Sequence, residues 1–419
     1  MKLIFVLEAK PHFCYDKKTL SVDAYSIHHS LMSKILSMLL LGVPPAYHVW
    51  CTCVGTNSIF VSAAVVLYTC SCGQARKLPF PSLTRFYSFL LNFTTQSLSY
   101  FTFMKVIEHI QKAKDETLFS IEILPPQKGK TIDDLLKVIE PFMEFKPPFI
   151  DVTYHPEEMI VKKNPDGSVY EVPLRKRPGT VGICAAIQNK LGVDAVPHLV
   201  CHGFTKEETE DALFTLHYLG IDNVLLLKGD DKMPTSNANK RGHQFANQLV
   251  TQVADLNNGK YLYEETANEL KTNFCIGVAG YPEKHFEAPN MIADLNNLKR
   301  KVEAGADYIV TQMFFDNKKY FDFVDLCRQN GISIPIIPGL KPIDKKAQLK
   351  VLPSMFYIDL PQDLVLAIDA CKDDQAAKQI GIEWAIMQSK ELKAAGVPVL
   401  HYYTMSRSES VVKIASAVF

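Results

Sequence analysis

Glu122 is the residue of this chain best suited to act as an acid. It alternates with Phe119, Ile121 and Ile123 in a short run that is typical of a strand with one apolar face. A carboxyl that is desolvated by apolar surroundings keeps its proton to higher pH. Glu122 is therefore a candidate general acid, and a glutamate held in a structural ion pair is the alternative.

Polar or conformationally special residues also end or follow the other apolar runs. They are Thr153, His198, Lys228-Gly229-Asp230, Tyr281-Pro282-Glu283 with His285, Gln312, Pro338-Gly339 and Arg407. Each has a structural alternative: His198 could be a core histidine, Asp230 a helix cap, and Lys299–Lys301 a solvated helix face. Because the carboxyl ends of parallel strands meet at one face of a barrel, the set predicts an active site there.

The elements that must position these residues alternate between short apolar runs and amphipathic segments. The predicted strands are Leu118–Ile123, Phe149–Tyr154, Ala195–Cys201, Asn223–Lys228, Phe274–Tyr281, Tyr308–Met313, Ile334–Gly339 and Val397–Tyr403. Eight such units predict an α/β fold, a closed (β/α)₈ TIM barrel over residues 104–419. An open doubly wound sheet is the alternative, although neither the glycine fingerprint G-x-G-x-x-G nor a Walker A motif occurs.

Three segments carry clear helical signals. Thr205 and Glu208 form a capping-box pair before a helix that runs through Tyr218. Apolar residues in Pro289–Ala304 are spaced for one helix face, and no proline interrupts Asp373–Ala395. Residues 231–273 are too long for one crossover and include the polar stretches 237–241 and 257–260, so we predict a surface insertion there.

The charges are balanced overall but not along the chain. The 419 residues hold 45 basic and 45 acidic side chains, which argues against nucleic acid or an anionic membrane as the main partner. Residues 1–103 contain three acids and eight Lys or Arg. We interpret 1–103 as translated leader sequence ahead of a start at Met104; a poorly ordered or anchoring extension and a small domain are the alternatives.

The cysteines favour a reduced, cytoplasmic protein without a bound metal. Five are isolated in apolar or mixed surroundings, as expected for core thiols: Cys184, Cys201, Cys275, Cys327 and Cys371. The pairs Cys51-x-Cys53 and Cys70-x-Cys72 have one intervening residue, whereas zinc ligand pairs usually have two to four. No apolar run approaches the roughly 20 residues of a membrane span, so no membrane association is expected for 104–419.

Eight short motifs, in order, resemble those of methylenetetrahydrofolate reductase, the flavoenzyme of one-carbon metabolism. They are Phe-Ser-Ile-Glu-Ile-Leu-Pro-Pro (119–126), Val-Thr-Tyr (152–154), Pro-His-Leu (197–199), Lys-Gly-Asp (228–230), Tyr-Pro-Glu-Lys-His (281–285), Asn-Leu-Lys-Arg-Lys (297–301), Thr-Gln-Met-Phe-Phe-Asp (311–316) and Ile-Pro-Gly-Leu (337–340). Each is weak alone, but their shared order and spacing are highly specific.

The resemblance implies non-covalent FAD, NADH or NADPH as co-substrate, and a folate substrate. The positions that match FAD contacts are Thr153, His198, Lys228, Gly229, Asp230, Phe245, Ala246, Tyr281, His285, Ala288, Asp294, Asn297, Arg300 and Lys301. Those that match folate contacts are Asp230, Gln312, Gln348 and Arg407, and Thr153 and Gln312 also match nicotinamide-nucleotide contacts. The resemblance further implies a homo-oligomer.

The activity implied is reduction of 5,10-methylenetetrahydrofolate to 5-methyltetrahydrofolate by a ping-pong mechanism that feeds methionine synthesis. Glu122 would be the general acid, and Asp230 would orient the pterin and favour hydride donation. Leu352 stands where some bacterial members have a stacking aromatic, and no regulatory domain is expected after Phe419. A proline dehydrogenase-like flavin barrel and a flavin-free lyase or binding protein remain the alternatives.

Overall fold

The computed structural model describes residues 47–54, 60–67, 103–155, 158–229, 242–263 and 270–419. The chain divides into two compact units, Met1–Leu98 and Ser99–Phe419. In the first unit, β1 (Tyr47–Val54) pairs antiparallel with β2 (Phe60–Leu67). The interpretation of 1–103 as a leader stays a prediction, and Cys70 and Cys72 lie outside the described residues.

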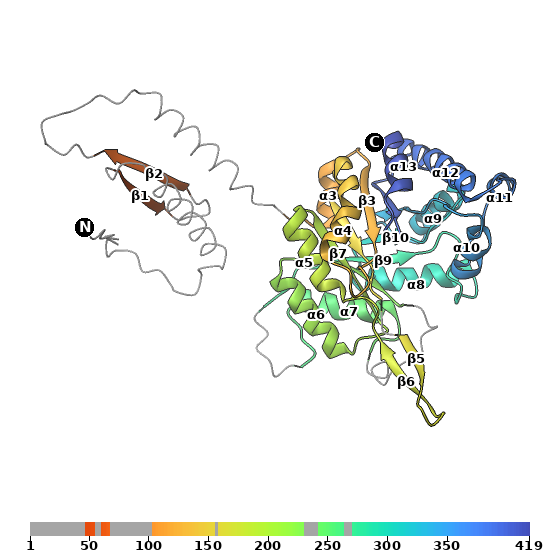
Figure 1. The fold of residues 1–419 in the computed structure, drawn as a ribbon, viewed down its shortest axis with the longest axis horizontal. Coiled ribbons are helices and arrows are strands. Elements are labelled where there is room, and N and C mark those ends of the chain that lie inside the picture. The colour runs from red at the N-terminus through yellow and green to blue at the C-terminus, as the bar shows by residue number, and fades with distance from the viewer. Residues whose placement is uncertain (1–46, 55–59, 68–102, 156–157, 230–241, 264–269) are drawn as a thin grey trace, which may run out of the picture. The chain divides into compact units, whose positions relative to one another are not determined.

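The second unit is a parallel α/β barrel, as predicted (Figure 1). Its sheet has the order β11-β10-β9-β8-β7-β4-β3-β13-β12. The strands are β3 (Leu118–Ile123), β4 (Phe149–Val152), β7 (Asp194–Val200), β8 (Asn223–Leu227), β9 (Cys275–Gly280), β10 (Tyr308–Thr311), β11 (Ile336–Ile337), β12 (Gly339–Leu340) and β13 (Val399–Tyr403). Only Pro338 separates β11 from β12, so the two ends of the sheet meet and together supply the eighth strand position.

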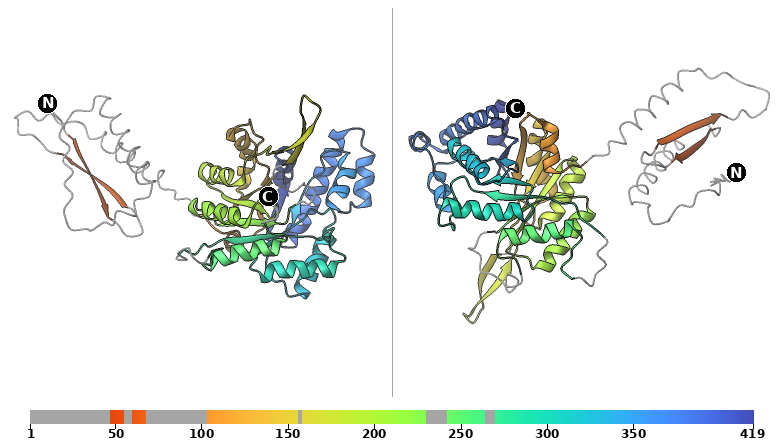
Figure 2. Two further views of the ribbon diagram at one scale, coloured as in Figure 1. Left: turned by 90° about the horizontal axis from the view of Figure 1, so that it is seen from below. Right: turned by 180° about the vertical axis from the view of Figure 1, so that it is seen from behind.

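Helices surround this barrel (Figure 2). Their bounds are α3 (Val106–Ala113), α4 (Ile132–Ile139), the 3₁₀ helix η1 (Glu140–Phe145), α5 (Thr180–Leu191), α6 (Lys206–Tyr218), α7 (Ala246–Asn257), α8 (Met291–Glu303), α9 (Asn317–Gln329), α10 (Gln348–Phe356), α11 (Gln362–Asp369), α12 (Asp374–Ala394) and α13 (Glu409–Val418). The three helices predicted from sequence are confirmed as α6, α8 and α12. The capping box of Thr205 and Glu208 is formed as expected.

The prediction of a surface insertion over 231–273 is wrong for its central part. Residues 246–257 form α7, whose Leu249, Val250, Val253 and Leu256 are buried in the core between helices and sheet. Asn257, read from sequence as part of a polar surface stretch, bonds through its side chain to the backbone of Phe274. The polar flanks of this segment concealed a barrel helix, and 231–241 and 264–269 lie outside the described residues.

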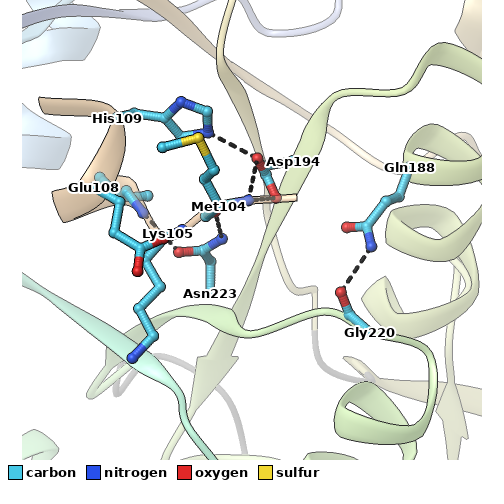
Figure 3. Close-up of polar contacts among 9 residues, drawn as sticks. Met104, Lys105, Glu108, His109, Gln188, Asp194, Gly220 and Asn223 are labelled. Atoms are coloured by element: carbon cyan, nitrogen blue, oxygen red, sulfur yellow. Dashed lines mark hydrogen bonds and ion pairs between the residues drawn. The ribbon is translucent and has the colours of Figure 1, made fainter. Parts of the chain in front are cut away.

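Helix α3 packs against the amino-terminal ends of the strands. Figure 3 shows the polar contacts of Met104 and His109 with Asp194 there. Val106 is fully buried against the lower barrel interior, in a cluster with Phe149, Cys275 and Tyr308. Both carboxylate oxygens of Asp194 accept from the backbone N–H of Met104, at 3.1 and 3.0 Å, and Oδ2 lies 2.7 Å from Nε2 of His109. These bonds attach the start of the barrel unit to β7.

Two additions to the barrel were not predicted. An exposed antiparallel hairpin, β5 (Glu158–Lys163) and β6 (Val169–Leu174), projects from the barrel between β4 and α5 (Figure 1). The short helices α10 and α11 precede α12 and form a separate apolar cluster with it.

Apolar side chains of the strands alternate between two cores, one facing the helices and one filling the barrel. The five cysteines of the described barrel are free, with four buried and Cys371 partly exposed, which fits the expectation of core thiols. Within the described residues no helix is long and apolar enough to cross a membrane, and no group of His, Cys, Asp or Glu could hold a metal ion.

Candidate active site

Glu122 points into the barrel near the carboxyl end of β3, as predicted. Its neighbours Ile121 and Ile123 face the helices, and its own side chain is 15% exposed. Thr404 fixes the strand there, because its hydroxyl donates to the carbonyl of Glu122 at 2.7 Å. Burial raises the pKa of Glu122 to about 7; the charge of Asp151 adds to the rise, and His198 and Lys341 oppose it.

Beside Glu122 lies a buried aspartate–histidine pair. Nε2 of His198, on β7, is 3.2 Å from Oδ2 of Asp151, on β4, and 3.8 Å from Oε2 of Glu122. His198 is thus a buried histidine with a carboxylate partner, and its ring nitrogen faces two acids. Burial lowers the pKa of His198 and raises that of Asp151 to about 7.

The polar interior continues toward β13. Nδ1 of His401 lies 2.7 Å from the hydroxyl of Ser120. Three further buried atoms have no hydrogen-bond partner among the described residues: Oδ1 of Asp151, Nε2 of His401 and the hydroxyl of Tyr308. An unpaired buried polar atom costs free energy, so these three atoms lower the stability of the barrel interior.

Two residues that match FAD contacts after β8 and β9, Lys228 and His285, lie beside the carboxylate of Glu287. Glu287 accepts from Nζ of Lys228 at 2.7 and 2.8 Å, and its Oε2 lies 3.8 Å from Nδ1 of His285. The His285 ring meets that of Tyr281 edge-on, with centroids 4.6 Å apart. This places a cation and two rings together after the ends of neighbouring strands.

A second part of the predicted FAD set lies on and before α8. The carboxylate of Asp294 accepts from the backbone N–H of His285 at 2.9 Å, and Arg300 donates to Asn297 at 3.3 Å. Nζ of Lys301 donates to the carbonyl of Ala279 at 2.5 Å, and burial lowers its pKa to about 8. The carbonyl of Ala288, which is buried, accepts from Nζ of Lys284 at 2.7 Å. Lys301 is therefore a half-buried cation whose charge an anionic ligand would stabilise.

The remaining predicted FAD positions border the segment after β8. Gly229 has φ +88°, a conformation that favours glycine, and an added Cβ would lie 3.5 Å from Val200. Asp230 lies outside the described residues. Phe245 is the N-cap of α7 and is 54% exposed, and Ala246 begins that helix. Thr153 directly follows β4, and its hydroxyl lies 3.3 Å from Nδ1 of His155.

The positions that match folate contacts are more dispersed. Gln312 directly follows β10 and bonds through its side chain to the N–H of Met313. The side-chain oxygen of Gln348 accepts from Asp344 and Lys345 backbone N–H groups, so it orders its own loop. Arg407 lines a cavity of about 360 Å³ together with Asp344, Lys345 and Ser408, among others. Leu352 is buried with Met313 and Phe315, so it does not offer a surface for stacking.

Four residues of this site were not identified from sequence. Asp151 and His401 carry an available signal, because each alternates with apolar neighbours in a predicted strand as Glu122 does. Lys341 is buried just beyond β12. Burial lowers the pKa of Lys341, and the nearby charges of Glu122 and Arg407 also affect it. Glu287 lies in a loop and had no periodic signal.

Comparison with known proteins gives one consistent result. Residues 105–418 match the family described as methylenetetrahydrofolate reductase. A probable methylenetetrahydrofolate reductase (NADH) of Oryza sativa is 32% identical over 324 residues, which are 74% of this chain and 50% of the relative. The 5,10-methylenetetrahydrofolate reductase of Escherichia coli is 32% identical over 291 residues, 69% of this chain and 86% of the relative.

The chain thus spans about half the length of the plant relatives it matches. A solved structure of a protein from Clostridium thermocellum, which binds two copies of 5-methyl-5,6,7,8-tetrahydrofolic acid, aligns with a TM-score of 0.47 at 14% identity. It covers 75% of this chain and 98% of that one, a likeness too low to support an inference.

Proposed function

Because this chain belongs to the methylenetetrahydrofolate reductase family, we propose that it reduces 5,10-methylenetetrahydrofolate to 5-methyltetrahydrofolate with NADH or NADPH. The observation that carries the proposal is the position of Glu122. Its side chain is only 15% exposed, its pKa is raised to about 7, and it lies at the carboxyl end of a barrel strand. That is where a proton must be delivered if the substrate ring is to open near neutral pH.

The residues after β8 and β9 are chemically suited to hold FAD. Lys228, Lys301 and Arg300 supply positive charge for a pyrophosphate. Tyr281 and His285 supply ring surfaces, and Gly229 allows close approach of the backbone. A bound flavin supplies acceptance of hydride from the nicotinamide and its donation to the folate carbon.

The protein's own part in the reaction is placement and proton transfer. Glu122 would protonate a bridging nitrogen of the five-membered ring, which opens the ring to an iminium and leaves a carboxylate on the protein. Gln312, directly after β10, and Arg407, in the loop after β13, would hold the folate, with Asp230 orienting the pterin. The residues around Glu122 on the inner side, Asp151 and His198, are buried, and the Glu122 side chain is 15% exposed.

Absorption spectra of the purified protein test this function. The expected protein is yellow, bleaches anaerobically with NADH or NADPH, and recovers its colour on addition of methylenetetrahydrofolate. Proline serves as the control substrate, because a proline dehydrogenase-like enzyme would bleach with it. Two results contradict the proposal: a protein that stays colourless after incubation with FAD, and a reduced flavin that methylenetetrahydrofolate does not reoxidise. The same material would establish whether the enzyme is the homo-oligomer that the family resemblance implies.

A further inference from the structure

One histidine ring nitrogen faces two acids in the barrel interior. Nε2 of His198 faces Oδ2 of Asp151 at 3.2 Å and Oε2 of Glu122 at 3.8 Å. Burial lowers the pKa of His198, so the ring is neutral and carries a single N–H. A hydrogen on Nε2 can be donated to the nearer acid or to the farther one, and the geometry favours Asp151.

Asp151 has little other compensation for a negative charge. It is fully buried, its Oδ1 has no hydrogen-bond partner, and within the described residues His198 is its sole partner in an ion pair. No described lysine or arginine pairs with it, whereas Lys341 acts on Glu122. The titratable groups around the two acids are His198, Cys184, Tyr308, Lys341, His401 and Tyr403.

From this arrangement, and on the basis of the proposed function, we propose that Asp151 is a positioning residue for Glu122. As a carboxylate it accepts a hydrogen bond from the Nε2–H of His198 and places a negative charge beside Glu122, so that Glu122 keeps its own proton for the folate half-reaction. When Glu122 gives up that proton, the His198 N–H can turn from Asp151 to the new Glu122 carboxylate.

Electrostatics support the assignment. The charge of Asp151 contributes to the raised pKa of Glu122, in addition to burial, while His198 and Lys341 lower it. Removing the charge of Asp151 should therefore let Glu122 ionise at lower pH. Removing the acceptor oxygens of Asp151 as well should free the His198 N–H for Glu122. The pH at which Glu122 ionises should then fall at least as far as it does when only the charge is removed.

The test compares two variants. Asp151→Asn removes the charge, and Asp151→Ser also replaces the two carboxylate oxygens by a single hydroxyl on a shorter side chain. Stopped-flow absorbance follows flavin reoxidation by methylenetetrahydrofolate across pH. We expect the midpoint of its alkaline fall to move about one pH unit lower, which slows reoxidation about tenfold at alkaline pH and leaves the acid-side rate unchanged. Reduction by NADH should keep its wild-type pH profile. Asp194→Asn, in the other buried aspartate–histidine pair, is the matched control and should leave the midpoint in place.

A second measurement needs neither flavin nor turnover. Infrared difference titration follows the C=O band of the protonated Glu122 carboxyl, identified by its loss in Glu122→Gln. In both Asp151 variants that band should disappear at lower pH than in the wild-type protein. The shift would support the pairing even if the wild-type enzyme did not use folate, so the two proposals fail separately.

The proposal is overturned if the band and the reoxidation midpoint stay in place in both variants. It is also overturned if they move to higher pH, or if Asp194→Asn moves them equally. An equal slowing of both half-reactions without a change of midpoint would show that Asp151 only supports the shape of the site.

Discussion

Two aspartate–histidine pairs with a buried aspartate lie in the same barrel, one at its base and one beside Glu122 in the candidate active site. At the base, Asp194 meets His109 at 2.7 Å and also accepts from the backbone of Met104 with both oxygens. In the interior, Asp151 meets His198 at 3.2 Å, has one oxygen without a partner, and shares the histidine with Glu122. In the first pair, two groups, the N–H of Met104 and the ring of His109, contact one aspartate. In the second pair, one histidine nitrogen faces two acids, Asp151 and Glu122. The difference separates a pair suited to stability from one suited to proton transfer.

The largest expected effect comes from removing the acid of the interior cluster. Glu122→Gln keeps size and hydrogen bonding but cannot donate the proton that opens the folate ring. Reoxidation of the flavin by methylenetetrahydrofolate should slow about 10²–10⁴-fold, and reduction by NADH should stay near normal. Stopped-flow absorbance separates the two. Equal losses in both half-reactions would mean that Glu122 maintains the flavin site and is not the acid.

The pH dependence of the wild-type protein gives the next effect. The pKa of Glu122 is raised to about 7, so the protonated acid is present below that pH and is lost above it. The folate half-reaction should therefore fall as pH rises through about 7, approaching tenfold for each further pH unit. The NADH half-reaction needs no such proton and should lack this fall. A folate half-reaction that instead rises with pH would show that the carboxylate form acts.

At the base of the barrel, the expected effect is on stability. Asp194→Asn removes the charge that both His109 and the backbone of Met104 contact, at a cost of about 1.5–3 kcal/mol in the free energy of unfolding. Urea unfolding with matched m-values measures it. The pH profile of either half-reaction should not change. A shifted profile with unchanged stability would reverse the roles given to the two pairs.

The smallest effect is expected from removing residues 1–103, which precede the contact between Met104 and Asp194. A chain beginning at Met104 should fold, bind FAD and turn over like the full chain, because every family motif follows that residue. A free ammonium there would meet the Asp194 carboxylate at the position now held by the backbone N–H. Loss of soluble, flavin-loaded protein would show that residues before Met104 belong to the fold.

Sequence patterns predict the barrel better than they predict the site. The alternation in β3, the strand at β13 and the capping box of α6 depend on residues close together in the chain, and these predictions are confirmed. The interior pairs join distant residues: Asp151 and His198 are 47 positions apart, and Ser120 and His401 are 281 apart. Periodicity shows that each points inward but cannot show which side chains meet.

The missed helix α7 has a similar cause. The sequence of α7 has apolar residues at helical spacing, but the polar stretches 237–241 and 257–260 on either side of it favour the interpretation of 231–273 as an insertion. Gln348, which matches a folate contact, bonds through its carboxamide oxygen to the backbone of its own loop. Such local bonds compete with ligand contacts and leave no mark in residue type.

The break between β11 and β12 has a consequence for how the barrel opens. Each of these segments contributes two residues to the sheet, and Pro338 between them has no N–H to donate. Local opening begins where the fewest backbone hydrogen bonds must be broken. The strand position shared by β11 and β12 is therefore the least stable part of the barrel. It lies against Thr311 and Tyr403, and the hydroxyl of Tyr403 donates to the carbonyl of Thr311 at 2.6 Å. Amide exchange should spread through the sheet from this seam and reach β4 and β7, which hold the interior pair, last.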